Sequence, residues 1–298
     1  YCNSLPNKKV IYIFNIIPII FVILWSSAFI TSKIIVDNAS PFLSLSIRFG
    51  IVAFLFFLFF IFFSKNKYIS LNAFKNASIS GLLFHGLYLG GVFFALSKGI
   101  SATLIALIVS LQPILTSILA KLYLNEALTK FQCIGILLGF SGAIIIIVSD
   151  LIDGLTTVAF FAGIVGLVSS SLGIIWQKKI GSDLSLSGNN FIQALSASIF
   201  HLLLALCFED FFIIFSNNFI LAMSWQIFAV SLGAYLILMW LLANNKANET
   251  STLFFLVSPI SALLSFLILK ETFNSYDVLG LFLSCLGVFM VSKNQIKI

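Results

Sequence analysis

The sequence predicts an all-α integral membrane protein with ten transmembrane helices, arranged as two inverted five-helix repeats. Three observations predict this fold. Of the 298 residues, 60% are hydrophobic and only 9% are charged. Long apolar runs follow one another with short polar breaks, and two segments half a chain apart share a residue pattern. A soluble domain carries roughly 25% charged residues, so this chain has too few charges to cover a surface that faces water.

The apolar runs define the expected spans. A helix needs roughly 20 apolar residues to cross the hydrocarbon core, and lipid offers no partners to exposed backbone groups, so each span should be helical. The sequence contains ten such runs, at residues 11–32, 42–63, 77–97, 101–122, 131–149, 158–177, 189–208, 222–243, 248–269 and 276–292.

The lysines between these runs predict the orientation of the chain. If the N-terminus lies in the cytoplasm, three lysines fall outside, namely Lys33, Lys98 and Lys270. The cytoplasmic segments then contain Lys8, Lys9, Lys65, Lys67, Lys75, Lys121, Lys130, Lys178, Lys179, Lys246, Lys293 and Lys297. This bias is the one expected for an even number of spans with both termini inside. We therefore expect a multi-pass protein of the cell membrane.

Several classes of function lack their sequence patterns. The four cysteines are far apart and show no metal-ligand spacing, so we expect no metal site and no cofactor. The +6 charge lies between apolar runs and indicates membrane topology, so we expect no nucleic acid partner. The chain contains no Walker A loop, HExxH or DDxxD sequence, which argues against ATP-driven transport by this chain alone and against an intramembrane enzyme.

An internal repeat links the two halves of the chain. Glu126 and Glu271 are 145 residues apart, and each follows a proline, Pro113 or Pro259, by about a dozen mostly apolar residues. The same offset relates the small residues that follow, pairing Gly135 with Gly280, Gly139 with Ser284 and Gly142 with Gly287. Hydrophobicity alone does not explain this shared order.

The repeat predicts two related five-helix units, at 11–149 and 158–292. Because five is odd, the second unit must enter the membrane from the opposite side. Inverted repeats of this kind recur in secondary transporters, where two similar halves surround one central site and open it to each side in turn.

The chain resembles the EamA-type members of the drug/metabolite transporter superfamily. The resemblance rests on the run from Trp25 to Lys33, on Pro41 followed by Arg48, and on the two proline-to-glutamate segments. It covers nearly the whole chain. It implies ten helices around a central cavity lined mainly by spans one, three, four, six, eight and nine, and transport of amino acids, nucleobases or other polar metabolites, often outward.

Polar residues inside spans are the candidates for the binding site, because they are costly in lipid and tend to face a cavity or another helix. Arg48 is the basic residue well inside a span, and it either attracts an anionic group of the substrate or has a structural role. His85 and Tyr88 share a face of span three. His85 either serves proton coupling or is a neutral histidine bonded between helices.

Aromatic and amide side chains complete the candidate site, because aromatic faces with a few hydrogen-bonding groups suit a planar or zwitterionic metabolite. Membrane anchoring is the alternative for the tryptophans, and packing for the serine. The remaining candidates are Trp25, Ser27, Gln112, Gln177, Tyr235 and Trp240. Pro113 and Pro259 each remove a helix hydrogen bond and are candidate hinges. Glu126 and Glu271 are expected to cap or tether helix ends.

These features predict a secondary transporter of small polar metabolites that works by alternating access, with no enzymatic activity. The alternative is a membrane receptor or scaffold without flux. The expected partners are the substrate and the lipid bilayer, with protons as a candidate coupling ion. Export and import, and a monomer and a homodimer, remain open.

Overall fold

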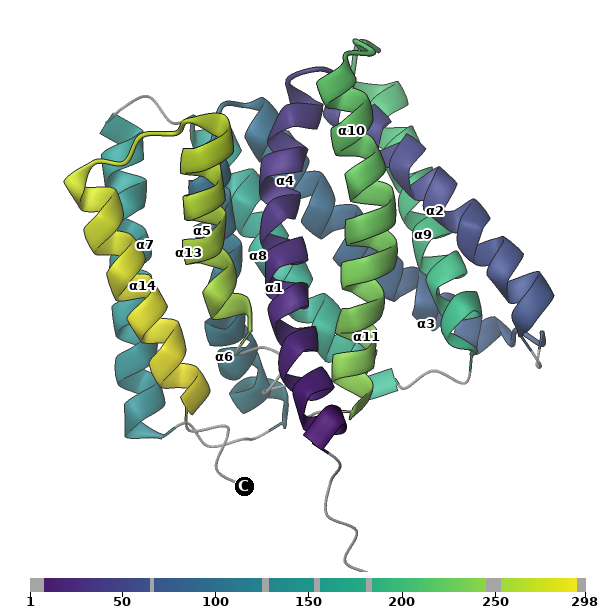
Figure 1. Ribbon diagram of the computed structural model, residues 1–298, viewed down its shortest axis with the longest axis horizontal. Helices are drawn as coiled ribbons and strands as arrows, with labels where there is room; N and C mark the ends of the chain where they lie inside the picture. Colours follow the sequence, from purple (N-terminus) through teal and green to yellow (C-terminus); the bar gives the residue numbers. More distant parts are fainter. Residues whose placement is uncertain are drawn as a thin grey trace, which may run out of the picture.

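The computed structural model describes residues 8–64, 67–124, 129–152, 156–180, 184–244 and 253–293. These residues form a bundle of roughly parallel and antiparallel helices (Figure 1). The first half contains α1 (Lys8–Val36), α2 (Pro41–Phe63), α3 (Leu71–Gly81), η1 (Leu82–Leu87), α4 (Tyr88–Ser97), α5 (Ala102–Ser110), α6 (Gln112–Leu124) and α7 (Lys130–Ile152). The second half contains α8 (Thr157–Ile180), α9 (Leu186–Phe208), α10 (Asn217–Trp225), η2 (Gln226–Ala234), α11 (Tyr235–Asn244), α13 (Phe254–Leu264), η3 (Ser265–Leu269) and α14 (Ser275–Lys293).

Seven described segments are helical, long and apolar enough to cross a membrane. Three shorter apolar helices, at Lys130–Ile146, Leu256–Leu269 and Ser275–Met290, lie where further spans were expected. The protein is therefore an all-helical, multi-pass membrane protein, and the count of ten spans stays a prediction. The third span begins at Leu71 and not near residue 77, because the Ser70 side chain caps the helix by accepting a hydrogen bond from Ala73 N.

The two prolines that were considered as hinges occupy different positions. The fourth span is interrupted at Leu111, between α5 and α6, and Pro113 lies in the first turn of α6. The prediction that Pro113 removes a helix hydrogen bond is therefore wrong, since a first-turn proline removes no hydrogen bond within its own helix. Pro259 lies inside α13, as the sequence indicated.

Two π-helical segments widen the third and eighth expected spans, and each ends just before a tyrosine, Tyr88 or Tyr235. In η1 the backbone N–H of Tyr88 donates to Leu83 O, and in η2 that of Tyr235 donates to Val230 O, five residues back in each case. Segments of this kind often occur at functional sites. Both segments contribute side chains to the cavity described below.

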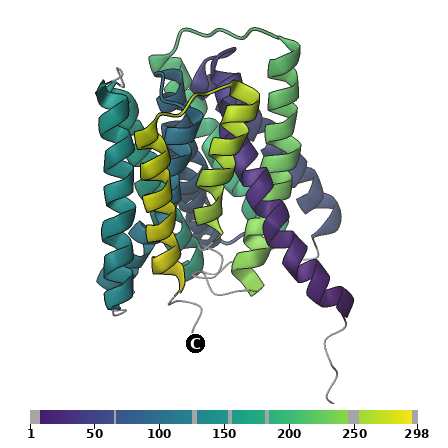
Figure 2. The same cartoon turned by 60° about the vertical axis from the view of Figure 1, so that its left-hand side comes forward.

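Helices α7 and α14 pack backbone against backbone and lie side by side at one end of the bundle (Figures 1 and 2). The Ser284 hydroxyl donates to Gly139 O at 3.1 Å. A Cβ atom added to Gly287 would overlap the backbone of Gly135 and Gly139, and one added to Gly142 would overlap that of Gly280. Small residues allow this close approach in membrane helices. Of the three pairs that the repeat relates, Gly139 and Ser284 therefore meet in space. The other four glycines meet crosswise, Gly135 with Gly287 and Gly142 with Gly280.

Helices α2 and α9 form a second close pair. The Ser46 hydroxyl donates to Ser198 O at 3.1 Å, and the Ser198 hydroxyl donates to Ser46 O at 2.9 Å. Each hydroxyl therefore satisfies a carbonyl of the other helix. This reciprocal pair joins the two halves of the chain near the face opposite the start of α1.

Two glutamates cap helix N-termini across the halves on that face. Glu209, which follows α9, accepts hydrogen bonds from the backbone N–H groups of Phe42 and Leu43 at 2.8 and 3.0 Å. Burial raises the pKa of the Glu209 carboxyl, although both N–H groups act to lower it. Glu271, which follows η3, accepts from Ala102 N at 2.9 Å and from the Thr103 hydroxyl at 2.8 Å. The expected tethering by Glu271 is confirmed, and Glu126 lies outside the described residues.

Candidate functional site

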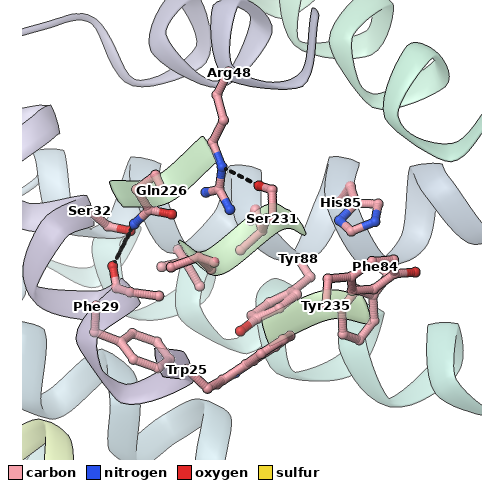
Figure 3. Close-up of a pocket in the computed structure, with 14 residues that line it drawn as sticks. Trp25, Phe29, Ser32, Arg48, Phe84, His85, Tyr88, Gln226, Ser231 and Tyr235 are labelled. Atoms are coloured by element: carbon pink, nitrogen blue, oxygen red, sulfur yellow. Dashed lines mark hydrogen bonds between the residues drawn. The ribbon is translucent and has the colours of Figure 1, made fainter. Parts of the chain in front are cut away.

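A cavity lies between α1, α2, η1, α4, η2 and α11 (Figure 3). It is lined by Trp25, Ala28, Phe29, Ser32, Arg48, Phe84, His85, Tyr88, Leu89, Val92, Gln226, Val230, Ser231 and Tyr235. Its volume of about 30 Å³ has room for only a few water molecules. Aromatic and aliphatic side chains form most of its wall, so its few polar groups are surrounded by apolar surface.

Arg48 is the basic side chain in the wall of the cavity. It extends from α2, is 3% exposed, and donates from Nε to the Ser231 hydroxyl at 2.9 Å (Figure 3). Its guanidinium carbon lies 5.1 Å from the centre of the Phe49 ring, within the range of a cation–π contact. Neither partner carries a negative charge. An arginine keeps its proton in proteins, so a buried positive charge lies beside the cavity.

Gln226, the first residue of η2, connects this wall to α1. Its Nε2 atom lies 2.8 Å from Ala28 O, 2.8 Å from the Thr31 hydroxyl and 3.0 Å from the Ser32 hydroxyl. Among the described residues, its buried Oε1 atom has no hydrogen-bond partner. This amide therefore offers the cavity a neutral acceptor.

A buried network begins at Tyr235 and leads away from the cavity. The Tyr235 hydroxyl donates to Gln193 Oε1 at 2.8 Å and accepts from Gln177 Nε2 at 2.9 Å. Gln177 Nε2 also lies 3.3 Å from Gln193 Oε1. The three side chains come from α8, α9 and α11, so the hydroxyl of one cavity residue holds three helices of the second half together.

We expect Tyr235→Phe to lower the free energy of unfolding by about 1–2 kcal/mol, because the change removes two hydrogen bonds to buried glutamine amides and leaves only the longer contact of 3.3 Å between Gln177 Nε2 and Gln193 Oε1. Chemical unfolding in mixed micelles would measure this loss. Tyr276→Phe is the matched control, since Tyr276 is 63% exposed and the same atom is removed at the surface. Equal stability of both variants would contradict the structural role of the network.

Two buried histidines lie near Arg48. The His85 ring lies 4.5 Å from that of Tyr235 and 5.0 Å from that of Phe49, measured between ring centres. His201 of α9 is fully buried against Phe49 and Phe42. His85 Nδ1 and both ring nitrogens of His201 have no hydrogen-bond partner among the described residues. The rings of Phe42, Phe49 and Phe200 surround His201.

The structure brings five of the nine candidate binding residues to the cavity: Trp25, Arg48, His85, Tyr88 and Tyr235. Gln177 is one hydrogen bond away, through the Tyr235 hydroxyl. Ser27 accepts instead from Trp225 Nε1 at 2.8 Å. Gln112 is 1% exposed at the start of α6, and Trp240 packs against the hydrophobic core. Ser27, Gln112 and Trp240 do not line the cavity.

Sequence reasoning missed several lining residues, among them Phe29, Phe84, Gln226 and Ser231. Gln226 carried a usable signal, because an amide inside an apolar span is as costly as the polar groups that were selected. The two phenylalanines carried none, since 34 phenylalanines are spread over the chain and nothing in the sequence separates these two from the rest.

A family model and several known proteins are similar to this chain over most of its length. The family model described as the EamA-like transporter family matches residues 11–148 and 157–293. The chain is 26% identical to the uncharacterized transporter YvbV of Bacillus subtilis (strain 168), over 74% of this chain and 71% of that protein. It is 27% identical to the uncharacterized transporter YyaM of the same organism, over 91% of each chain.

A third relative and a solved structure extend the comparison. An uncharacterized transporter in the trpA 3' region of Buchnera aphidicola subsp. Schlechtendalia chinensis is 26% identical over 95% of this chain and 93% of its own. A crystal structure superposes with a TM-score of 0.69 at 14% identity, covering 95% of this chain and 98% of the other, which shows a shared fold. With family matches to both halves and a cavity inside the bundle, this chain belongs to the EamA-like transporter family.

Proposed function

We propose that this protein is a secondary transporter that moves small polar metabolites across the cell membrane by alternating access. The observation that carries the proposal is the buried cavity, where Arg48, His85 and Gln226 lie among aromatic side chains. A few polar groups on an apolar wall are typical of small-molecule sites. The proposal includes ten helices in two inverted repeats, at 11–149 and 158–292, and no enzymatic activity.

The packing of equivalent helices supports the inverted arrangement. The repeat relates Gly139 to Ser284 by 145 residues, and these two residues are joined by a hydrogen bond. A two-fold axis between inverted halves brings equivalent helices together, as in other transporters built from repeats. α1 begins and α14 ends on the same side of the bundle (Figure 1). With the lysine distribution, this supports cytoplasmic termini.

Proteoliposomes test the proposal, using counterflow of labelled amino acids, nucleobases and organic acids. We expect saturable flux of at least one compound, and we expect Ala28→Phe to reduce it more than tenfold by filling the cavity. Ile23→Phe is the control, because Ile23 lies on the same helix but is 49% exposed. Absence of flux of every compound in the panel would reject transport. Equal flux in the two variants would reject the cavity as the path of the substrate. A pH gradient in the same vesicles, with and without His85→Gln, tests proton coupling.

A receptor without flux is the second candidate. The cavity of about 30 Å³ is too small for an amino acid or a nucleobase in this conformation, so binding requires the surrounding helices to separate in a receptor as well as in a transporter. A receptor would bind its ligand saturably in detergent and show no counterflow in liposomes. The transport assay therefore separates the two functions.

A further inference from the structure

The charge balance of the cavity restricts the compounds that it can hold. Arg48 contributes a positive charge, and none of the fourteen lining side chains is an aspartate or a glutamate. Within the described part of the chain, the salt bridge that forms is Lys33–Asp37, at a partly exposed position. Among the described residues, no carboxylate compensates the Arg48 charge. A buried charge without a counter-charge is energetically costly.

The rest of the cavity wall carries no permanent charge. Trp25, Phe29, Phe84, Tyr88 and Tyr235 provide aromatic surface. The unpartnered Gln226 Oε1 atom accepts a hydrogen bond but carries no charge. An ammonium group in this space would meet only neutral acceptors and would be repelled by Arg48. A carboxylate or sulfonate would instead form charge-assisted hydrogen bonds with the guanidinium group.

We propose that the site around this cavity, once the surrounding helices separate to admit a ligand, selects monoanions: compounds with one carboxylate or sulfonate on an aromatic body and no ammonium group, held through Arg48. This inference rests on the proposed function for its biological meaning and narrows the substrate class. Among the polar metabolites considered above, it favours aromatic organic acids over amino acids, whose ammonium group has no anionic partner here.

Four probes that share a benzyl or phenyl body test this selectivity. They are phenylacetate, phenylmethanesulfonate, phenylglycine and benzylamine, which are two anions, a zwitterion and a cation. Isothermal titration at pH 7 on the full chain in nanodiscs of neutral lipid would give each Kd. We expect phenylacetate to bind at least tenfold more tightly than phenylglycine, and benzylamine to show no measurable binding. The proposal would be overturned if phenylglycine or benzylamine bound as tightly as phenylacetate or more tightly. It would also be overturned if neither anion bound.

Variants of Arg48 test its role, with the ratio of the phenylglycine Kd to the phenylacetate Kd as the readout. We expect Arg48→Gln to bring this ratio close to one and Arg48→Lys to keep it above three. Lys98→Gln is the control, because Lys98 also lies over a phenylalanine ring, at 5.2 Å from that of Phe94, but does not line the cavity. A ratio unchanged in Arg48→Gln would overturn the assignment. The probe series on the unchanged chain decides the selectivity even if a variant does not fold.

Binding and flux separate this inference from the proposed function. Phenylmethanesulfonate stays charged at neutral pH, so its counterflow in liposomes requires the protein. Anion binding without flux of any compound would reject transport and keep the charge selectivity. Flux of a zwitterion or a cation, with no binding of either anion, would keep transport and reject the selectivity.

Discussion

Replacing Gly287 by alanine is expected to lower the free energy of unfolding by about 3 kcal/mol, at the upper end of the usual loss on overpacking. The added Cβ would overlap the backbone N of Gly139 and the backbone O of Gly135. Backbone atoms cannot move aside by changing a rotamer, so α14 must shift away from α7. The contact between these helices would open along its length.

Unfolding of purified protein by SDS titration in mixed micelles, followed by tryptophan fluorescence, measures this effect. Gly233→Ala is the matched control: its added Cβ would lie 3.5 Å or more from its neighbours, an ordinary contact. That variant should be neutral or slightly stabilised, because alanine is less flexible in the unfolded chain. If the Gly287→Ala variant were as stable as the Gly233→Ala variant, α7 and α14 would not be packed as described.

Replacing Glu271 by alanine is expected to lower the free energy of unfolding by about 2 kcal/mol, by removing a helix cap that also connects the two halves. The carboxylate accepts from the backbone N of Ala102 at 2.9 Å and from the Thr103 hydroxyl at 2.8 Å. Its charge also lies at the N-terminus of α5, where the helix dipole favours an anion. Glu271→Gln should lower the free energy of unfolding by about half as much, since glutamine keeps a hydrogen-bond acceptor but not the charge.

Asp37→Ala provides the comparison for Glu271→Ala. Its carboxylate forms a salt bridge with Lys33, but the Asp37 side chain is 52% exposed, and surface pairs of this kind contribute 0–1 kcal/mol. Both proteins should be measured by the same SDS titration. Similar losses in the two variants would indicate that Glu271 acts as a surface charge and not as a tether between helices.

The sequence was most informative where the bilayer imposes a rule on composition. Length and hydropathy located the helices to within a few residues, apart from early starts such as Leu71, where a serine cap extends a span into polar sequence. Spacing identified Glu271 as a tether, because a carboxylate at a membrane boundary has few other stable roles. The break at Leu111 before Pro113 escaped prediction, since proline is compatible with both a kinked helix and a helix start.

What the sequence determined by itself is the class of protein and the short set of polar side chains that lipid would not tolerate, because the energetic cost of burying such groups acts locally. It also predicted which small residues correspond in the two halves. Only the tertiary structure decided which polar groups share a space. Arg48, Gln226 and Tyr235 come from α2, η2 and α11 and line one cavity, whereas Ser27, Gln112 and Trp240 do not. The rotation of each helix about its axis determines which side chains face the cavity, and this rotation depends on packing against helices that are far away in the sequence.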